Sequence, residues 1–393
     1  MDFIIHGVSA ADPVAVKKEF HKIGVDPAGA VQMETKSLHR LVKIYGLTPK
    51  QANIIKQEML AKGGDAAVAR GTIDASVEKT DVLLMGTEKQ YRAAIKKLRM
   101  QPFGLARLAE QLEGTLGNMR GRKSRTLDCR GTKLTLGART LIMGILNITP
   151  DSFSDGGRFY DPERAVAHAE RMQAEGADII DVGGESTRPG HIPISTEEEM
   201  DRVLPVLRAL VRELDVPVSI DTTKAAVARS ALEAGVHIVN DQWALRADEG
   251  MASLAAEYRA PLVLMHNQKG TAYRDLIGDM VGYFTASVKT ALEAGVSRDN
   301  IIIDPGIGFG KTAEQNIETM CRLRELDCLG LPVLLGTSRK SMIGKTLDLP
   351  SDQRVEGTGA TVALGIVNGV DIVRVHDVKE MVRVARMTDA MVR

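Results

Sequence analysis

Eight short apolar runs in the last two thirds of the chain each end in side chains that can hydrogen-bond or ionise. In chain order the end residues are Asn147, Asp181, Asp221, Asn240 with Asp241, His266, Asp304, Ser338 with Arg339 and Lys340, and Arg374 with His376. Asp, Asn and Ser often cap the helix that follows a strand, which would explain any single case. Capping does not account for polar residues at all eight ends, so we expect these side chains to form a site.

Four of the end residues suit a flat heterocyclic ligand. They supply two carboxylates, a carboxamide and an ammonium group: Asp221, Asn240, Asp304 and Lys340. Acceptor-only carboxylates and a donor-only ammonium can hold a ring that presents amino or imino donors together with a carbonyl acceptor. The sequence therefore predicts a pocket for such a ring.

A second group of residues suits an anion. It comprises end residues of the first, seventh and eighth runs and two residues of the loop after the second run: Asn147, Ser338, Arg374, His376, Thr187 and Arg188. In β/α barrels phosphate commonly binds beside the last strands. These donors predict an anion with more than one phosphate, bridged by Mg²⁺.

Other signals for chemistry are weak. The segment 305–312, PGIGFGKT, has Pro305 where a phosphate-binding Walker A loop requires its first glycine, so we expect its glycines to shape a pocket loop. His266 and His376 lack the close spacing of a zinc-ligand pair. The three cysteines lie away from the strand ends, which leaves no candidate thiol nucleophile.

A repeated pattern predicts the elements that position these residues. A helix end, a glycine and a β-branched strand recur at Gly176, Gly235, Gly295 and Gly369, and each interval holds a second strand. The strands are continuous apolar runs, as expected for parallel strands covered on both faces. Residues 141–393 match the roughly 250 residues of an eight-stranded parallel (β/α)8 TIM barrel. An open doubly wound sheet is the alternative, but no GxGxxG sequence follows a first strand.

Residues 1–118 are predicted to form a smaller N-terminal α/β domain of unknown role. We expect strands over residues 3–5, 66–69 and 81–85, and helices over residues 14–23, 48–62, 88–98 and 103–116. Residues 119–140 are predicted to be a linker and a short hairpin that turns at Gly131 and plugs the barrel from beneath.

Composition narrows the class of protein. The 393 residues are 44% hydrophobic and 26% charged, which is typical of a globular protein. A formal net charge of +0 argues against a nucleic-acid partner. Cys129, Cys321 and Cys328 form no disulfide framework. Because the sequence has neither a signal-like start nor about 18 consecutive apolar residues, we expect a cytoplasmic protein without membrane contact.

Eight ordered motifs carry a resemblance to a known family. The motifs are GILNITPDSFSDGG, IDVGGESTRPG, SIDT, NDQWAL, LMHNQ, DPGIGFGK, GTSRKSMIG and RVHDV. Over about residues 140–393 the chain resembles the dihydropteroate synthases. The resemblance implies a transferase of folate biosynthesis that condenses 4-aminobenzoate with 6-hydroxymethyl-7,8-dihydropterin diphosphate. It also implies Mg²⁺, a homodimer and sulfonamide inhibition.

The resemblance further implies residue roles. The implied pterin residues are Asp221, Asn240, Asp304 and Lys340. The implied diphosphate residues are Asn147, Thr187, Arg188, Arg374 and His376, with Mg²⁺ near Asn147 and Asp155. The implied aminobenzoate residues are Phe153, Pro189, Lys340 and Ser341. The implied catalytic residues are Lys340, Asp221, Arg374 and His376.

Two other functions stay open on the sequence. A pterin-dependent methyltransferase has a similar barrel pocket but would lack the DSFSDGG and SRKS loops, and both are present here. A non-catalytic pterin-binding protein would be indicated by a changed Lys340 or Arg374, and both residues are intact.

Overall fold

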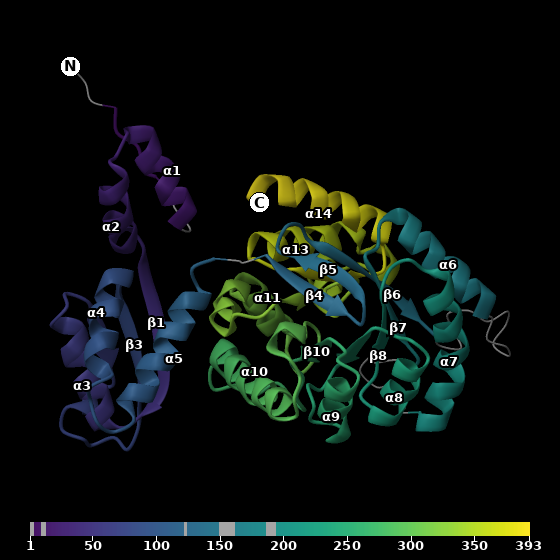
Figure 1. Cartoon of the computed structure of the whole chain (residues 1–393), viewed down its shortest axis with the longest axis horizontal. Coiled ribbons are helices and arrows are strands. Elements are labelled where there is room, and N and C mark those ends of the chain that lie inside the picture. The colour runs from purple at the N-terminus through teal and green to yellow at the C-terminus, as the bar shows by residue number, and fades with distance from the viewer. Residues whose placement is uncertain (1–3, 9–12, 122–123, 149–161, 186–193) are drawn as a thin grey trace. The chain divides into compact units, whose positions relative to one another are not determined.

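The chain divides into two compact units, residues 1–121 and 122–393 (Figure 1). A computed structural model describes residues 4–8, 13–121, 124–148, 162–185 and 194–393. None of the helices in these ranges combines the length and the apolar character that a membrane span requires.

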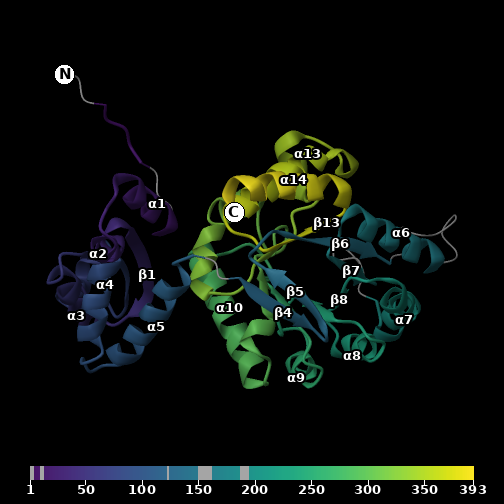
Figure 2. The same ribbon diagram turned by 45° about the horizontal axis from the view of Figure 1, so that its top comes forward.

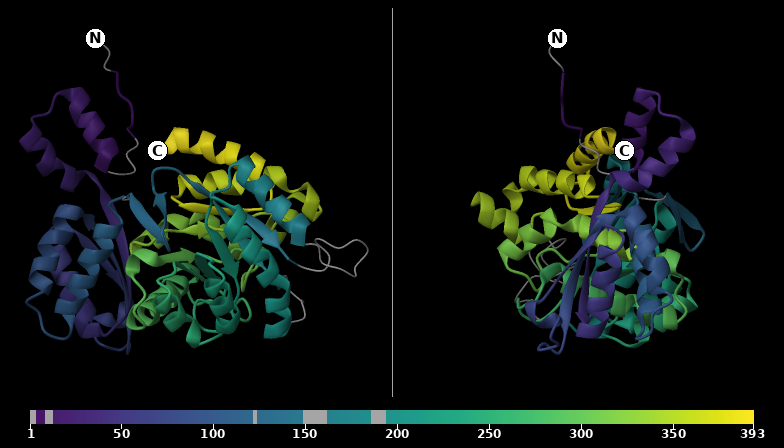
Figure 3. Two further views of the ribbon diagram at one scale, coloured as in Figure 1. Left: turned by 45° about the vertical axis from the view of Figure 1, so that its right-hand side comes forward. Right: turned by 90° about the vertical axis from the view of Figure 1, so that its left-hand side faces the viewer.

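The first unit is an α/β domain built on an antiparallel sheet. Its helices and strands are α1 (Pro13–Ile23), α2 (Pro27–Ser37), β1 (His39–Leu47), α3 (Pro49–Leu60), β2 (Asp65–Val68), β3 (Thr80–Thr87), α4 (Glu88–Leu98) and α5 (Leu105–Asn118). The strands pair in the order β1-β3-β2. Helices α1 and α2 lie together at one end of this unit (Figures 1 and 3).

Helices α3, α4 and α5 form the core of this unit with the sheet, because each buries one apolar face. The predicted helices and the later two strands are confirmed within a few residues. The strand predicted over residues 3–5 is wrong for Ile4 and Ile5, which lie in no strand. Helix α2 and strand β1 were not predicted. The sequence of helix α2 carries no apolar stripe that would predict a helix, and the folded helix buries no residue.

A two-stranded hairpin begins the second unit. Strands β4 (Arg125–Cys129) and β5 (Thr132–Leu136) pair antiparallel on either side of a turn at Arg130 and Gly131. Leu127, Cys129 and Leu136 are buried among residues from the amino ends of the barrel strands. The predicted hairpin, its turn and its place beneath the barrel are confirmed.

Eight parallel strands within the described residues form the predicted TIM barrel (Figures 1 and 2). The strands are β6 (Leu141–Asn147), β7 (Ile179–Gly183), β8 (Val218–Asp221), β9 (Ile238–Asp241), β10 (Leu262–Met265), β11 (Ile301–Asp304), β12 (Leu334–Leu335) and β13 (Ile372–Val375). The helices are α6 (Pro162–Glu175), α7 (Thr196–Glu213), α8 (Ala225–Glu233), α9 (Gly250–Glu257), α10 (Leu276–Glu293), α11 (Ala313–Cys321), α12 (Ser341–Leu347), α13 (Val355–Val367) and α14 (Val378–Val392).

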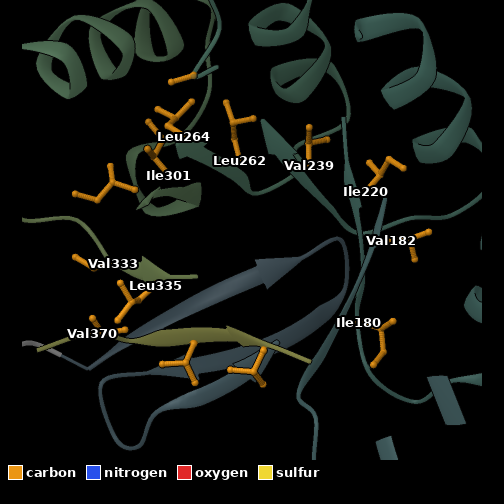
Figure 4. Packing of buried hydrophobic residues seen from close by; sticks show 14 of the residues in the cluster. Ile180, Val182, Ile220, Val239, Leu262, Leu264, Ile301, Val333, Leu335 and Val370 are labelled. Atoms are coloured by element: carbon orange, nitrogen blue, oxygen red, sulfur yellow. The ribbon is translucent and has the colours of Figure 1, made fainter. Parts of the chain in front are cut away.

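Outward-facing residues of the strands form the larger core of the barrel. Side chains such as Ile180, Val182, Ile220 and Val239 stand on the outer face of the strands, beneath the surrounding helices (Figure 4). They are almost fully buried. Since successive side chains of a strand point to opposite faces, this outer packing fixes which residues face the interior.

The barrel closes at a weak seam between β11 and β12. The other neighbouring pairs of its described strands share ladders of two to five residue pairs, the shortest between β12 and β13. Across the seam the described strands meet at a single bridge between Ile303 and Val333, which includes a hydrogen bond from Ile303 N to Pro332 O at 3.0 Å. Asp304 and Lys340 follow on opposite sides of this seam.

Candidate active site

Inward-facing residues of the barrel form two layers. The lower layer is apolar, and its strand members are Leu141, Met143, Ile179, Ile238, Val263, Ile302, Leu334 and Ile372. Two residues further along four of these strands stand Asp181, Asn240, Asp304 and Arg374. Because side chains alternate along a strand, these four face the same interior, above the apolar layer.

Arg374 joins two buried carboxylates across the barrel. Its Nε donates to Oδ2 of Asp181 at 2.6 Å, and its Nη2 donates to Oδ2 of Asp221 at 2.8 Å. The Asp181 side chain is 0% exposed and that of Asp221 is 8% exposed. The guanidinium that the sequence predicted to lie on the anion therefore contacts Asp221 of the predicted ring pocket and the neighbouring Asp181 in this structure.

Gln242 caps the carboxylate of Asp221 from the loop after β9. Its Nε2 donates to both carboxylate oxygens, at 2.7 and 2.8 Å. No role was predicted for Gln242, although its position directly after the Asn240–Asp241 strand end was the available signal. Arg374 also donates to Asp221, so three hydrogen bonds already reach this carboxylate.

Asp304, at the end of β11, and Lys340, after β12, follow strands that lie three and four places around the barrel from β8. Oδ1 of Asp304 accepts a hydrogen bond from the backbone N of Gly306 at 2.7 Å. Nζ of Lys340 lies 4.1 Å from the centroid of the Phe309 ring, a cation–π contact. A Cβ atom at Gly308 would come within 3.1 Å of Cδ of Lys340, so the glycine makes room for the lysine side chain.

The charged groups of this pocket titrate near neutral pH. Burial raises the pKa of Asp221 to about 7, although Arg374 opposes the shift. Burial raises the pKa of Asp304 to about 6 and lowers the pKa of Lys340 to about 8. Lys340 also interacts electrostatically with Arg374, Asp304 and Asp221. Groups with strongly shifted pKa values that influence one another at a strand edge are typical of a functional site.

Lys311 organises the glycine-containing loop at residues 305–311. Its Nζ donates to the carbonyls of Pro305 at 2.8 Å, Gly306 at 3.1 Å and Phe309 at 3.2 Å, and lies 3.0 Å from Nδ1 of His266. Burial lowers the pKa of Lys311 to about 7 and that of His266 to about 3. The lysine thus faces its own loop rather than a phosphate, which agrees with the prediction of a pocket loop.

Asn147 and His376 line a cavity of about 570 Å³ together with the basic residues Arg164 and Arg171 of α6. Nδ1 of His376 lies 2.9 Å from Oγ of Ser338, and the His376 backbone N donates to the same oxygen at 3.1 Å. Burial, reinforced by Arg374, lowers the pKa of His376 to about 3. The imidazole is therefore neutral and can offer one N–H to an anion.

Several predicted residues lie outside the described part of the chain: Phe153, Asp155, Thr187, Arg188 and Pro189. Ser341 is the first residue of α12 and is exposed. Among the described residues no group of three or more His, Cys, Asp or Glu could hold a metal ion. The Asn147 side-chain oxygen still suits Mg²⁺, which commonly takes few protein ligands and completes its shell with phosphates and water.

Comparison with known proteins agrees with this site. A family model described as pterin binding enzyme matches residues 143–376. A dihydropteroate synthase of Bacillus subtilis is 53% identical over 269 residues, which cover 68% of this chain and 94% of that protein. A solved structure of dihydropteroate synthase from Clostridium difficile, determined in the presence of pteroic acid, is 56% identical with a TM-score of 0.65 and covers 66% of this chain and 98% of that chain.

A relative with a longer match includes the first unit. A probable bifunctional folylpolyglutamate synthase/dihydropteroate synthase of Halobacterium salinarum is 43% identical over 373 residues, covering 93% of this chain and 44% of that protein. A match over 93% of the chain must include most of residues 1–121. The N-terminal unit therefore has a counterpart in that relative.

Proposed function

The chain belongs to the dihydropteroate synthase family of pterin-binding enzymes, and from this premise we propose how its residues divide the work. The reaction joins 4-aminobenzoate to 6-hydroxymethyl-7,8-dihydropterin diphosphate and releases diphosphate. About 50% identity to dihydropteroate synthases favours this transferase activity over the methyltransferase alternative.

The pterin ring binds between Asp221, Asn240, Asp304 and Lys340. The observation that carries this assignment is the cluster of acceptors and one ammonium at a single end of the barrel, with pKa values close to neutral. Donors of the ring replace Gln242 on the carboxylate of Asp221, which is already arranged to accept two hydrogen bonds. Lys340 donates to a ring acceptor while the negative charge of Asp304 favours its ammonium form.

Diphosphate departs on the side of Asn147 and His376, where α6 adds two arginines to the cavity. The carbon–oxygen bond between the methylene group and the diphosphate breaks, and the aniline nitrogen forms the new bond to that carbon before losing a proton. The pterin ring can delocalise positive charge at the methylene carbon. The site therefore needs orientation and charge stabilisation more than a strong base. Arg374 supplies positive charge next to both the ring and the leaving group.

Mg²⁺ bound to Asn147 and Asp155 would neutralise diphosphate charge. The carboxamide oxygen of Asn147 and the carboxylate oxygens of Asp155 are ligand types that Mg²⁺ prefers. In the described structure Oδ1 of Asn147 lies 3.8 Å from where a Cβ would stand on Gly183, so the glycine keeps the approach to this oxygen open.

The aminobenzoate pocket comprises Phe153, Pro189, Lys340 and Ser341, and sulfonamides bind there because they also carry an aniline beside an acidic group.

The enzyme is a cytoplasmic homodimer in this proposal. Exposed apolar side chains on the neighbouring helices α13 and α14 support self-association: Leu364, Val367, Met387, Met391 and Val392. Sedimentation velocity of wild-type protein and of Met387→Glu tests the dimer.

An assay of the purified protein with both substrates and Mg²⁺, following diphosphate release, tests the proposal. Arg374→Ala should lower the affinity for the pterin diphosphate and for free diphosphate together, because the positive charge serves both. Arg229→Ala, which removes an exposed arginine paired with Glu257, is the matched control. Turnover by the wild type with unchanged binding in Arg374→Ala would place the anion elsewhere.

A further inference from the structure

Asp181 occupies the centre of the polar layer without facing any position assigned to a substrate. It lies in the middle of β7, and its side chain is fully buried. Strand β7 stands two strands from β9 on one side and two strands from β13 on the other. From this place Oδ2 of Asp181 accepts hydrogen bonds from Nδ2 of Asn240 at 3.0 Å and from Nε of Arg374 at 2.6 Å.

The bond to Asn240 determines which end of its carboxamide meets a ligand. An ionised carboxylate only accepts hydrogen bonds, so Asn240 must turn its amino group toward Asp181. Oδ1 of Asn240 is then the atom left for a ligand, and a ligand held there must present an N–H donor. If Asp181 were absent, the carboxamide could rotate by half a turn and offer a donor instead.

The bond to Arg374 fixes the guanidinium in a plane between two carboxylates. Nε contacts Asp181 while Nη2 contacts Asp221, so rotation about the end of the side chain would break one bond or the other. Two charge-assisted hydrogen bonds from one planar guanidinium add directional specificity to the charge interaction.

Asp181 also carries a cost that an apolar residue would avoid. Its second oxygen, Oδ1, is buried and has no hydrogen-bond partner among the described residues. The corresponding inward position of β10 is Met265, a residue without this penalty. Buried polar atoms that stay unsatisfied call for a functional explanation.

We propose that Asp181 is a positioning residue that sets the hydrogen-bond polarity of the pterin pocket, by holding Asn240 as an acceptor and Arg374 in its plane. This inference rests on the proposed pterin site. In this proposal Asp181, which does not contact the substrate, determines whether the pocket accepts a ring edge that presents donors or one that presents acceptors.

The test measures equilibrium binding of the pterin substrate by calorimetry. Asp181→Asn should weaken binding by about tenfold or more, because the new amide allows Asn240 to flip and leaves Arg374 with a single carboxylate. Ser219→Ala, at the β8 position that pairs in register with Asp181, is the control and should change affinity less than twofold. A thermal melt shows whether each variant is folded.

The exchanged pair, Asp181→Asn with Asn240→Asp, separates positioning from general stability. Residue 181 would then donate its amide N–H to a carboxylate at position 240 and accept from Nε of Arg374 through its amide oxygen. Position 240 again presents an acceptor, so affinity should return to within about threefold of wild type. Wild-type affinity in a folded Asp181→Asn protein, or no recovery in the exchanged pair, overturns the inference. If Asp181→Asn does not fold, the exchanged pair alone decides by the same criterion. Failure of the wild type to bind the pterin would instead refute the proposed function.

Discussion

Replacement of Asp221 by Asn is the sharpest test of the pterin pocket. The carboxylate of Asp221 accepts hydrogen bonds from Gln242 and Arg374, and the proposed substrate takes the place of Gln242. An Asn at this position must turn a donor toward one of its partners. Loss of a charged hydrogen bond costs about 1.5–3 kcal/mol, so pterin affinity should fall roughly ten- to a hundred-fold.

The pKa of Asp221 makes this effect depend on pH. With a pKa of about 7 the group is mostly ionised at pH 8 and mostly protonated at pH 6. The ratio of wild-type to Asp221→Asn affinity should therefore decrease by up to about tenfold between pH 8 and pH 6. Taking the ratio removes the titration of the substrate itself. A ratio that stays constant over this range would refute the reasoning.

As pH rises, the contribution of Asp221 to folding stability should decrease, whereas its contribution to pterin affinity should increase. The folded-state pKa of this carboxyl lies above its usual value of 3.8, so between about pH 4 and pH 7 the native protein binds more protons than the unfolded chain. This group therefore makes the wild type less stable as pH rises through that window. Asn lacks the titration, so the melting temperature of the variant relative to wild type should be higher at pH 8 than at pH 5.

Three further outcomes are expected. A truncated protein that begins near Arg125 should fold and turn over within about tenfold of the full chain, as a melt and a diphosphate assay can show, because each described polar strand end lies in the barrel. Leu127→Ala should lower the free energy of unfolding by about 2–5 kcal/mol in urea titration while leaving turnover unchanged, since Leu127 is fully buried in the lower layer. A sulfonamide should compete with aminobenzoate and bind well only after the pterin; purely non-competitive kinetics would contradict the predicted pocket.

The barrel was predictable because the residues that end its helices and begin its strands can be recognised locally in the sequence. Each of the glycines Gly176, Gly235, Gly295 and Gly369 ends a helix with φ between 97° and 106°, a backbone conformation that favours glycine. The apolar runs that follow need no partner to be recognised as buried strands. In the first unit β1 escaped prediction because its residue types do not follow its alternating exposure: the exposed face carries Leu41, which is 57% exposed, and the half-buried face carries Arg40.

The polar strand ends were also predictable, but their partners were not. Spacing along a strand shows that Arg374 faces the interior, yet its long side chain can reach an anion or a carboxylate from the same backbone position. The choice depends on Asp181 and Asp221, which come from strands far away in the sequence. For the same reason neither the capping of Asp221 by Gln242 nor the loop contacts of Lys311 could be read from motifs.

The seam between β11 and β12 is the place where we expect the barrel to open locally. Amides near a single bridge should exchange with solvent deuterium through smaller openings than those in the continuous ladders. Because Asp304 and Lys340 stand on opposite sides of it, each such opening would alter the spacing of the charges that grip the ring. A ligand bound to both residues would hold the two sides of the seam together. Protection of the Ile303 amide from hydrogen exchange should therefore increase when the ligand binds.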